Sequence, residues 1–135
     1  MSQPELKAKL VLEATVSPSE DPAKVLQAMK NVVGETPCDF ATTPHSARVA
    51  TEDSRALVRV RDQLRDRHVR SAARKQMLLN ISECSTSLML NKQAAAAGVI
   101  ALCGSTEESP LGPIYLTAES EQIATVIDWL TAYAG

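Results

Sequence analysis

The apolar residues between positions 55 and 79 change phase partway along the segment, which limits how the chain can fold. At about 100° per residue, one set clusters on a single side of a helix: Leu57, Val60 and Leu64. A second set clusters on a side turned by well over a quarter revolution: Val69, Ala72, Ala73, Gln76 and Leu79. One straight helix could bury only one of these sides. The pattern therefore predicts two helices, or a sharp bend, with the break between Arg65 and His68.

The same segment concentrates positive charge. Residues 55–75 hold eight of the fourteen lysines and arginines and two aspartates, a balance of +6, whereas the rest balances six basic against fourteen acidic residues, or −8. On each predicted helix the basic side chains lie mainly away from the apolar stripe. We therefore expect one exposed basic ridge at the corner, made of Arg55, Arg59, Arg61, Arg65, Arg67, Arg70, Arg74 and Lys75. Such a field steers a polyanion, although a solvated helical face has the same charges.

Short strands and helices account for the rest of the chain. Period-two alternation and turn residues predict strands at 6–16, 38–42, 46–52, 85–92, 99–103 and 114–118. The second and third strands form a hairpin around Thr43 and Pro44. Residues 93–98 read as a short helix or a closely packed segment of small residues.

Capping residues mark the helix ends. A helix has Pro22 in its first turn and Gly34 as its C-terminal cap, Asp53 or Ser54 begins the basic helices, and Ser120 caps a final helix. Helices adjoin pairs of strands instead of alternating with single strands. This order favours an α+β fold, a mainly antiparallel sheet of five to six strands with helices packed on one face.

Size and composition suit a single domain over residues 1–135. The chain has 135 residues, of which 44% are hydrophobic, and no apolar run reaches membrane-spanning length. The first residues lack the features of a secretory signal, so we expect a soluble, cytoplasmic protein. Three widely spaced cysteines indicate neither a disulfide framework nor a zinc site, and we expect no cofactor.

Three C-terminal motifs, "LNKQAAAAG", "SPLGPI" and "IDWL", resemble an archaeal protein family of uncharacterised function. "SAARKQMLL" and "DPAKVLQAMKNV" match two of its helices, and the resemblance runs from about Leu6 to Leu130. That family is described as predicted RNA-binding or exosome-associated proteins. The resemblance implies a two-layer fold similar to the ribosomal protein that binds 5S RNA, and an archaeal cytoplasmic setting. The turn "RDRHVRSAAR" is more arginine-rich here than the family pattern.

Arginine-rich surfaces favour phosphate, because the guanidinium group donates two parallel hydrogen bonds and stays charged. Asp62 and Asp66 can pair with arginines at helical spacing, which leaves about four arginines for a ligand. Only four aromatic residues are present, so recognition of phosphates and shape in structured RNA fits better than base stacking. Asn91 to Gln93 read either as a helix cap with a surface lysine, or as a site where Lys92 and Gln93 extend the basic surface or bind an anion at a helix start.

Two other readings remain open. The basic ridge could dock an acidic surface of another protein, such as an RNA-processing subunit, and a homodimer is left open. The second reading is an enzyme that gathers Cys38, Asp39, His45 and Asp53. Against it, the sequence has no Walker loop, no G-x-G-x-x-G, no G-x-S-x-G and no H-E-x-x-H. The prediction is therefore a non-enzymatic RNA-binding protein.

Overall fold

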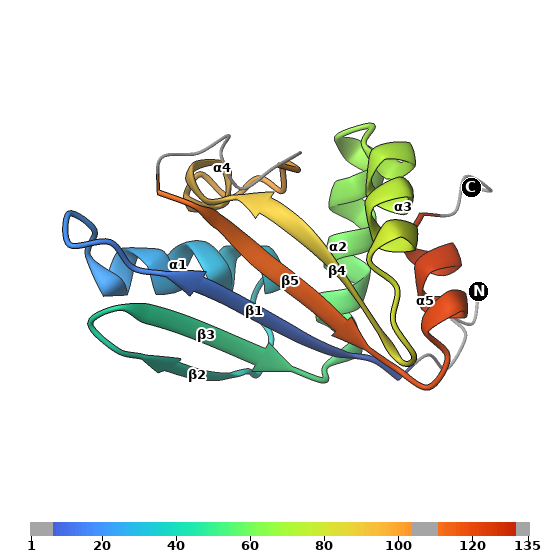
Figure 1. Cartoon of the computed structure of the whole chain (residues 1–135), viewed down its shortest axis with the longest axis horizontal. Coiled ribbons are helices and arrows are strands. Elements are labelled where there is room, and N and C mark those ends of the chain that lie inside the picture. The colour runs from blue at the N-terminus through green and yellow to red at the C-terminus, as the bar shows by residue number, and fades with distance from the viewer. Residues whose placement is uncertain (1–6, 104–110, 132–135) are drawn as a thin grey trace.

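The computed structural model describes residues 7–103 and 111–131, which form a five-stranded antiparallel sheet with helices packed against one face (Figure 1). The order of strands in the sheet is β2-β3-β1-β5-β4. The elements along the chain are β1 Lys9–Thr15, α1 Pro22–Val33, β2 Asp39–Thr42, β3 Ser46–Thr51, α2 Ser54–Asp66, α3 Arg70–Leu79, β4 Ser85–Asn91, α4 Lys92–Ala96, β5 Pro113–Glu119 and α5 Ile123–Leu130. The predicted α+β class is confirmed.

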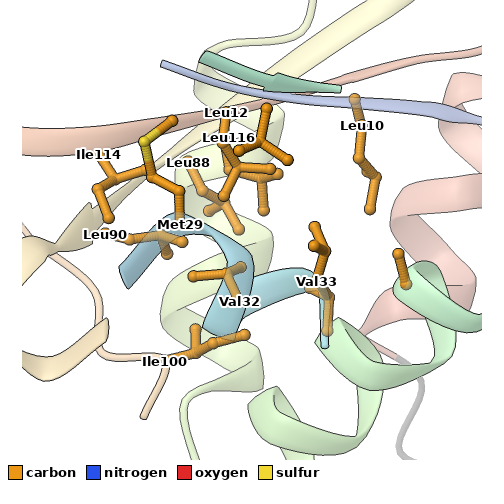
Figure 2. Close-up of a cluster of buried hydrophobic side chains, with 14 of the residues drawn as sticks. Leu10, Leu12, Met29, Val32, Val33, Leu88, Leu90, Ile100, Ile114 and Leu116 are labelled. Atoms are coloured by element: carbon orange, nitrogen blue, oxygen red, sulfur yellow. The ribbon is translucent and has the colours of Figure 1, made fainter. Parts of the chain in front are cut away.

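The core lies between the sheet and the helices. Strand β1 is central, and Leu12 stands opposite Val49 of β3 on one side and Leu116 of β5 on the other. Figure 2 shows side chains of this sheet face meeting Met29 and Val32 of α1. These five residues are at most 4% exposed, so period-two alternation in the strands and helical spacing in α1 supply the two sides of one core.

Helix α1 ends at a backbone conformation that only glycine adopts easily. Gly34 has φ +77° and ψ −162°, and its N–H donates to the carbonyl of Lys30 over 2.9 Å. At the other end of α1, the Asp21 carboxylate accepts from the N–H of Ala23, and Pro22 occupies the first turn. The predicted start and end of this helix are confirmed.

The predicted break in the basic segment is confirmed, because α2 ends at Asp66 and α3 begins at Arg70. His68 has φ +58°, the N–H of His68 donates to the carbonyl of Arg65, and the N–H of Val69 donates to the carbonyl of Leu64, each over 3.1 Å. These two bonds are those of a Schellman motif, with a histidine where glycine is usual. The motif turns the chain so that α3 packs back beside α2.

Residues 99–103 do not form the strand that the sequence predicts. The N–H of Asn91 donates to the carbonyl of Ala101, and the N–H of Cys103 donates to the carbonyl of Met89, around a single bridge between Leu90 and Leu102. The segment is apolar because it packs beside the end of β4. Its two backbone hydrogen bonds to β4 are too few to make it a strand of the sheet. The predicted hairpin of β2 and β3 is confirmed.

The predicted cap at Ser120 is wrong, because α5 begins at Ile123 and the residue that precedes it is Gln122, without a side-chain capping bond. The Oγ of Ser120 accepts from the N–H of Gln122, the residue that precedes α5. Among the described helices, none combines the length and apolar character that crossing a membrane requires.

Candidate nucleic-acid interface

Helices α2 and α3 form an antiparallel pair, and the pair with the turn between its helices carries all eight residues of the predicted basic ridge. The pair packs with α1 on one side and α5 on the other (Figure 1). Leu57, Val60 and Leu64 bury one face of α2, and Ala73 and Met77 bury one face of α3. Both stripes point inward, so the basic residues occupy the flanks and the outer surface of the pair.

Arg55 is held at the start of α2. Its Nε and Nη2 donate to the two carboxylate oxygens of Asp53 over 3.1 and 2.8 Å, while the same carboxylate accepts from the backbone N–H of Arg55. The side-chain and backbone hydrogen bonds from Arg55 lower the pKa of Asp53 to about 2, and Asp53 in turn raises the pKa of Arg55. Asp53 therefore both caps the helix and neutralises its first arginine.

The side chain of Arg59 does not lie on the predicted ridge but points toward α1. Its Nε donates to the backbone carbonyl of Asn31 over 2.9 Å, an acceptor in the last turn of α1. The side chain lies against Gly34, where an added Cβ would stand 2.6 Å from Cδ of Arg59. Arg59 thus satisfies a carbonyl at a helix end and ties α1 to α2.

Arg61 and Arg74 face α5. Nε of Arg61 donates to the carbonyl of Trp129 over 3.1 Å, and its guanidinium lies 4.9 Å from the centroid of the indole ring. Nη1 of Arg74 donates to Asp128 over 2.6 Å and to Oγ1 of Thr131 over 3.4 Å. Both arginines therefore connect the helical pair to the C-terminal helix.

The corner between α2 and α3 presents the remaining cations. Arg65 pairs with Asp62 and Asp66 at 3.6 and 3.2 Å, and Arg70 is half-buried at the start of α3. Arg67 and Lys75 are exposed, and their side chains make no hydrogen bond or ion pair within residues 7–103 and 111–131.

The expectation that all eight cations converge on one exposed ridge is wrong. Arg59 points to α1, and Arg61 and Arg74 point to α5. Arg55 is held by Asp53. The cations that remain at the corner and on the outer surface of α3 are Arg65, Arg67, Arg70 and Lys75. The partners come from elements distant in sequence, so spacing within the helices could not reveal them. Two carboxylates from outside the segment, at positions 53 and 128, reduce its balance from +6 to +4 (eight basic minus four acidic).

Lys92 does not extend the basic surface either. Its residue exposure is 3%, and Nζ donates to the carbonyls of Thr15 and Leu111 and to Oε1 of Glu20, over 2.8, 2.7 and 3.1 Å. Burial alone would raise the pKa of Glu20, but hydrogen bonds from Ser17 and Lys92 outweigh it and lower that pKa. Lys92 is a structural cation, because three acceptors match its three donors. Gln93 is exposed beside it.

The residues of the alternative enzyme reading are not brought together. Cys38 precedes β2, whereas His45 lies in the turn at the other end of that strand, and Asp53 is occupied by Arg55. Among the residues that the structure describes, no group of three or more His, Cys, Asp or Glu side chains could hold a metal ion.

A groove between α1 and α2 was not expected from the sequence. It has a volume of about 1100 Å³ and runs from Phe40 of β2 to Asp66 of α2. Phe40 is 57% exposed, and Nζ of Lys30 lies 3.9 Å from the centroid of its ring. The sequence feature that could have indicated this groove is Phe40, a large apolar residue in the short segment "CDFAT", which has few other apolar residues.

Comparison with known proteins gives consistent results. Residues 9–120 match a family model described as RNA binding. A UPF0201 protein of Sulfurisphaera tokodaii is 37% identical over 130 residues, covering 91% of this chain and 86% of that protein. A UPF0201 protein of Aeropyrum pernix is 34% identical, covering 92% and 85%. The crystal structure of a UPF0201 protein from Methanococcus jannaschii has a TM-score of 0.76 at 23% identity, covering 91% and 98%, and shares the fold. The expected exosome association and the likeness to the 5S-RNA-binding ribosomal protein stay predictions.

Proposed function

Since this chain belongs to the family whose model is described as RNA binding, we propose that it binds RNA, and that the outer surface of the α2–α3 pair contacts the phosphate backbone. The match over residues 9–120 carries the proposal, because it spans the sheet, α1 and both basic helices. The charge distribution supports it, since residues 55–75 remain positive after their ion pairs are counted, in a chain of net charge −2.

The corner offers cations that a phosphate can reach. Arg67 and Lys75 are exposed and unpaired among the described residues. The side chain of Arg65 is 52% exposed at the corner, and that of Arg74 is 41% exposed on the α5 side of the pair. Both have carboxylate partners that are also exposed. Exposed ion pairs contribute about 0–1 kcal/mol, so a phosphate can share or replace such a carboxylate at little cost. Arg59 and Lys92 are left out, because backbone carbonyls already hold them.

The recognition mode that fits these residues is contact with phosphates and shape. Lys30 covers one side of the Phe40 ring, and the indole of Trp129 lies against Arg61, so two of the chain's four aromatic residues already have a cation as partner. A surface with few free aromatic rings suits folded or double-stranded RNA better than unstacked bases.

A binding titration of a labelled RNA stem-loop by fluorescence anisotropy tests the proposal. About four phosphate contacts give a slope of log K against log salt near −3, or roughly 100-fold weaker binding between ~50 and ~200 mM salt. The variant Arg67→Glu/Lys75→Glu should weaken binding at least about tenfold and bring the slope closer to about −1. The matched control is Lys7→Glu/Lys24→Glu, which makes the same change of charge at exposed lysines away from the corner.

Equal losses in the two double variants would overturn the assignment to the corner, because only net charge would then matter. Absence of stem-loop binding at ~50 mM salt would overturn RNA binding itself. Retention on a polyglutamate matrix that survives an excess of the stem-loop would point instead to an acidic protein partner. Thermal unfolding of each variant shows whether a loss of binding reflects a loss of fold.

A further inference from the structure

The two edges of the sheet differ in how their backbone groups are satisfied. At the β4 edge, the N–H of Met89 donates to the side-chain carbonyl of Gln76, and the carbonyl of Met89 accepts from Cys103. The side-chain amide of Asn80 donates to the carbonyl of Ser87 over 3.1 Å. Residues from α3 and from the segment at 99–103 thus cover this edge, as proteins commonly do with edge strands.

The β2 edge has no such cover within the described part of the chain. The N–H of Thr43 donates to the carbonyl of Ser46 over 2.8 Å, which identifies this pair as hydrogen-bonded. Because hydrogen-bonded and non-bonded pairs alternate along an antiparallel ladder, Phe40 and Thr42 direct their N–H and C=O groups outward. All four residues of β2 are exposed, the strand contains no proline or lysine, and its register against β3 is unbroken, so nothing in the strand itself blocks pairing.

The groove beside this edge carries equal numbers of opposite charges. Its basic side chains are Lys30, Arg55 and Arg59, and its acidic side chains are Glu35, Asp62 and Asp66. A polyanion would meet repulsion as well as attraction on such a surface. A second surface with the same mixture can place each charge near its opposite, and the exposed Phe40 ring adds apolar area for it to cover.

We propose that a second copy of this chain pairs with β2 in antiparallel orientation, about a two-fold axis at Ala41. In this register Phe40 stands opposite the partner's Thr42, and Thr42 stands opposite the partner's Phe40. Four backbone hydrogen bonds form. Phe40 and Thr42 both direct their N–H and C=O groups outward, and in this register each stands opposite a residue of the partner that does the same. Each Phe40 ring packs beside the partner's Thr42 on the helix side of the sheet, since Val49, the neighbour of Phe40 on β3, faces the core.

Self-pairing is favoured over an unrelated strand because the edge complements itself. Ala41, the smallest side chain in β2, is the residue at the two-fold axis, where it meets its own copy. A closed two-fold contact uses the same surface on both subunits, which the mixed charges of the groove allow. The interface is short, so the dimer is weak and depends on concentration.

Sedimentation equilibrium of the full chain between about 10 µM and 1 mM tests the pairing. Phe40→Lys puts a charge on the edge, and Thr42→Pro removes an outward N–H that has no ladder partner to lose. Each should raise the dimer dissociation constant at least about tenfold, since each acts twice across the axis. The matched control is Leu79→Lys, which removes an apolar side chain that is 76% exposed at the end of α3.

Disulfide trapping gives a second readout that does not depend on the weak equilibrium. Ala41→Cys, in a chain that also carries Cys38→Ser and Cys84→Ser, should form a linked dimer on oxidation, because residues facing each other across a non-bonded pair have Cβ atoms about 5 Å apart. Arg48→Cys in the same background is the control, since Arg48 lies one strand further in.

A chain that stays monomeric up to about 1 mM and does not cross-link through Ala41→Cys would overturn the proposal. A dimer that dissociates with Leu79→Lys but not with Phe40→Lys would also overturn it, because the contact would then lie at α3. Both edge variants leave the α2–α3 pair unchanged, so RNA binding can be measured in them independently.

Discussion

The ammonium group of Lys92 donates to Oε1 of Glu20 across 3.1 Å, and the side chains of Lys92 and Glu20 are only 4% and 10% exposed. The same ammonium bonds the carbonyl at the end of β1 and the carbonyl of Leu111, before β5. One buried cation therefore fastens two neighbouring strands and the segment that leads into α1.

Replacing Lys92 should lower the free energy of unfolding far more than replacing a surface lysine. Lys92→Met leaves Glu20 charged and buried without its partner, and breaking a buried pair costs about 3–5 kcal/mol in the free energy of unfolding. Urea unfolding followed by circular dichroism measures the change. Lys24→Met is the matched control on the exposed face of α1 and should stay within about 0.5 kcal/mol.

The double variant Lys92→Met/Glu20→Leu separates charge from packing. Removing both charges should recover most of the loss, because the uncompensated carboxylate disappears. A double variant as unstable as Lys92→Met alone would show that the bonds to the two carbonyls matter more than the ion pair.

Asp53 should make stability depend on pH in a narrow acidic range. Its pKa falls from 3.8 to about 2 on folding, because Arg55 donates to its carboxylate. A group with a lowered pKa stabilises the fold above its unfolded pKa and loses that effect as the pH falls through its folded pKa. Asp53→Asn keeps a capping oxygen but loses the charge, so it should be less stable than wild type near neutral pH.

Thermal unfolding at a series of pH values checks this. The difference between wild type and Asp53→Asn should be constant above about pH 5 and should shrink between about pH 4 and 2. Asp39→Asn, an exposed carboxylate of β2, is the control. A difference that persists unchanged at about pH 2 would contradict the assignment of the effect to the Arg55 contact.

Glycine in place of His68 should stabilise the protein. His68 has φ +58° at the corner, a conformation that costs a side-chain-bearing residue about 1 kcal/mol and glycine almost none. We expect His68→Gly to raise the free energy of unfolding by about 0.5–1 kcal/mol in a urea titration. Ala72→Gly, on the exposed side of α3, should lower it by up to about 1 kcal/mol. A loss of stability in His68→Gly would mean that the imidazole makes a compensating contact.

Alanine at Gly34 should be more harmful than alanine at Gly98. Both glycines have positive φ, +77° and +83°, but an added Cβ at position 98 meets no atom within 4 Å, whereas at position 34 it meets Arg59. Gly98→Ala therefore measures the backbone cost, about 1 kcal/mol, and Gly34→Ala should exceed it, up to about 3 kcal/mol. Adding Arg59→Ala to Gly34→Ala should recover part of the excess, as differential scanning calorimetry can show. Equal losses in the two glycine variants would contradict a role for the Arg59 contact.

Local patterns were enough to predict most elements of the fold. Alternation in β1, Pro22 and Gly34 at the two ends of α1, and the change of apolar phase before His68 each depend on neighbours in sequence. The segment at 99–103 misled the prediction because an apolar run looks the same whether its backbone pairs along a whole strand or bonds an edge at two points.

The candidate site was harder to predict because its contacts are long-range. Arg74 meets Asp128 from 54 positions away, Arg59 reaches Asn31 across 28, and Lys92 bonds Thr15 across 77. No spacing rule within a helix encodes such pairs. Composition could predict a surplus of positive charge in residues 55–75, but packing of α1 and α5 decides which cations remain exposed.

The covered β4 edge also limits what an open β2 edge can lead to. A sheet that accepts strands at both ends can extend copy after copy into a fibre, as in amyloid. Here the side chains of Gln76 and Asn80 already form hydrogen bonds with backbone groups of β4 that an added strand would need. A chain that pairs through one edge alone stops at two copies. The β2 edge can therefore accept a strand without leading to a polymer.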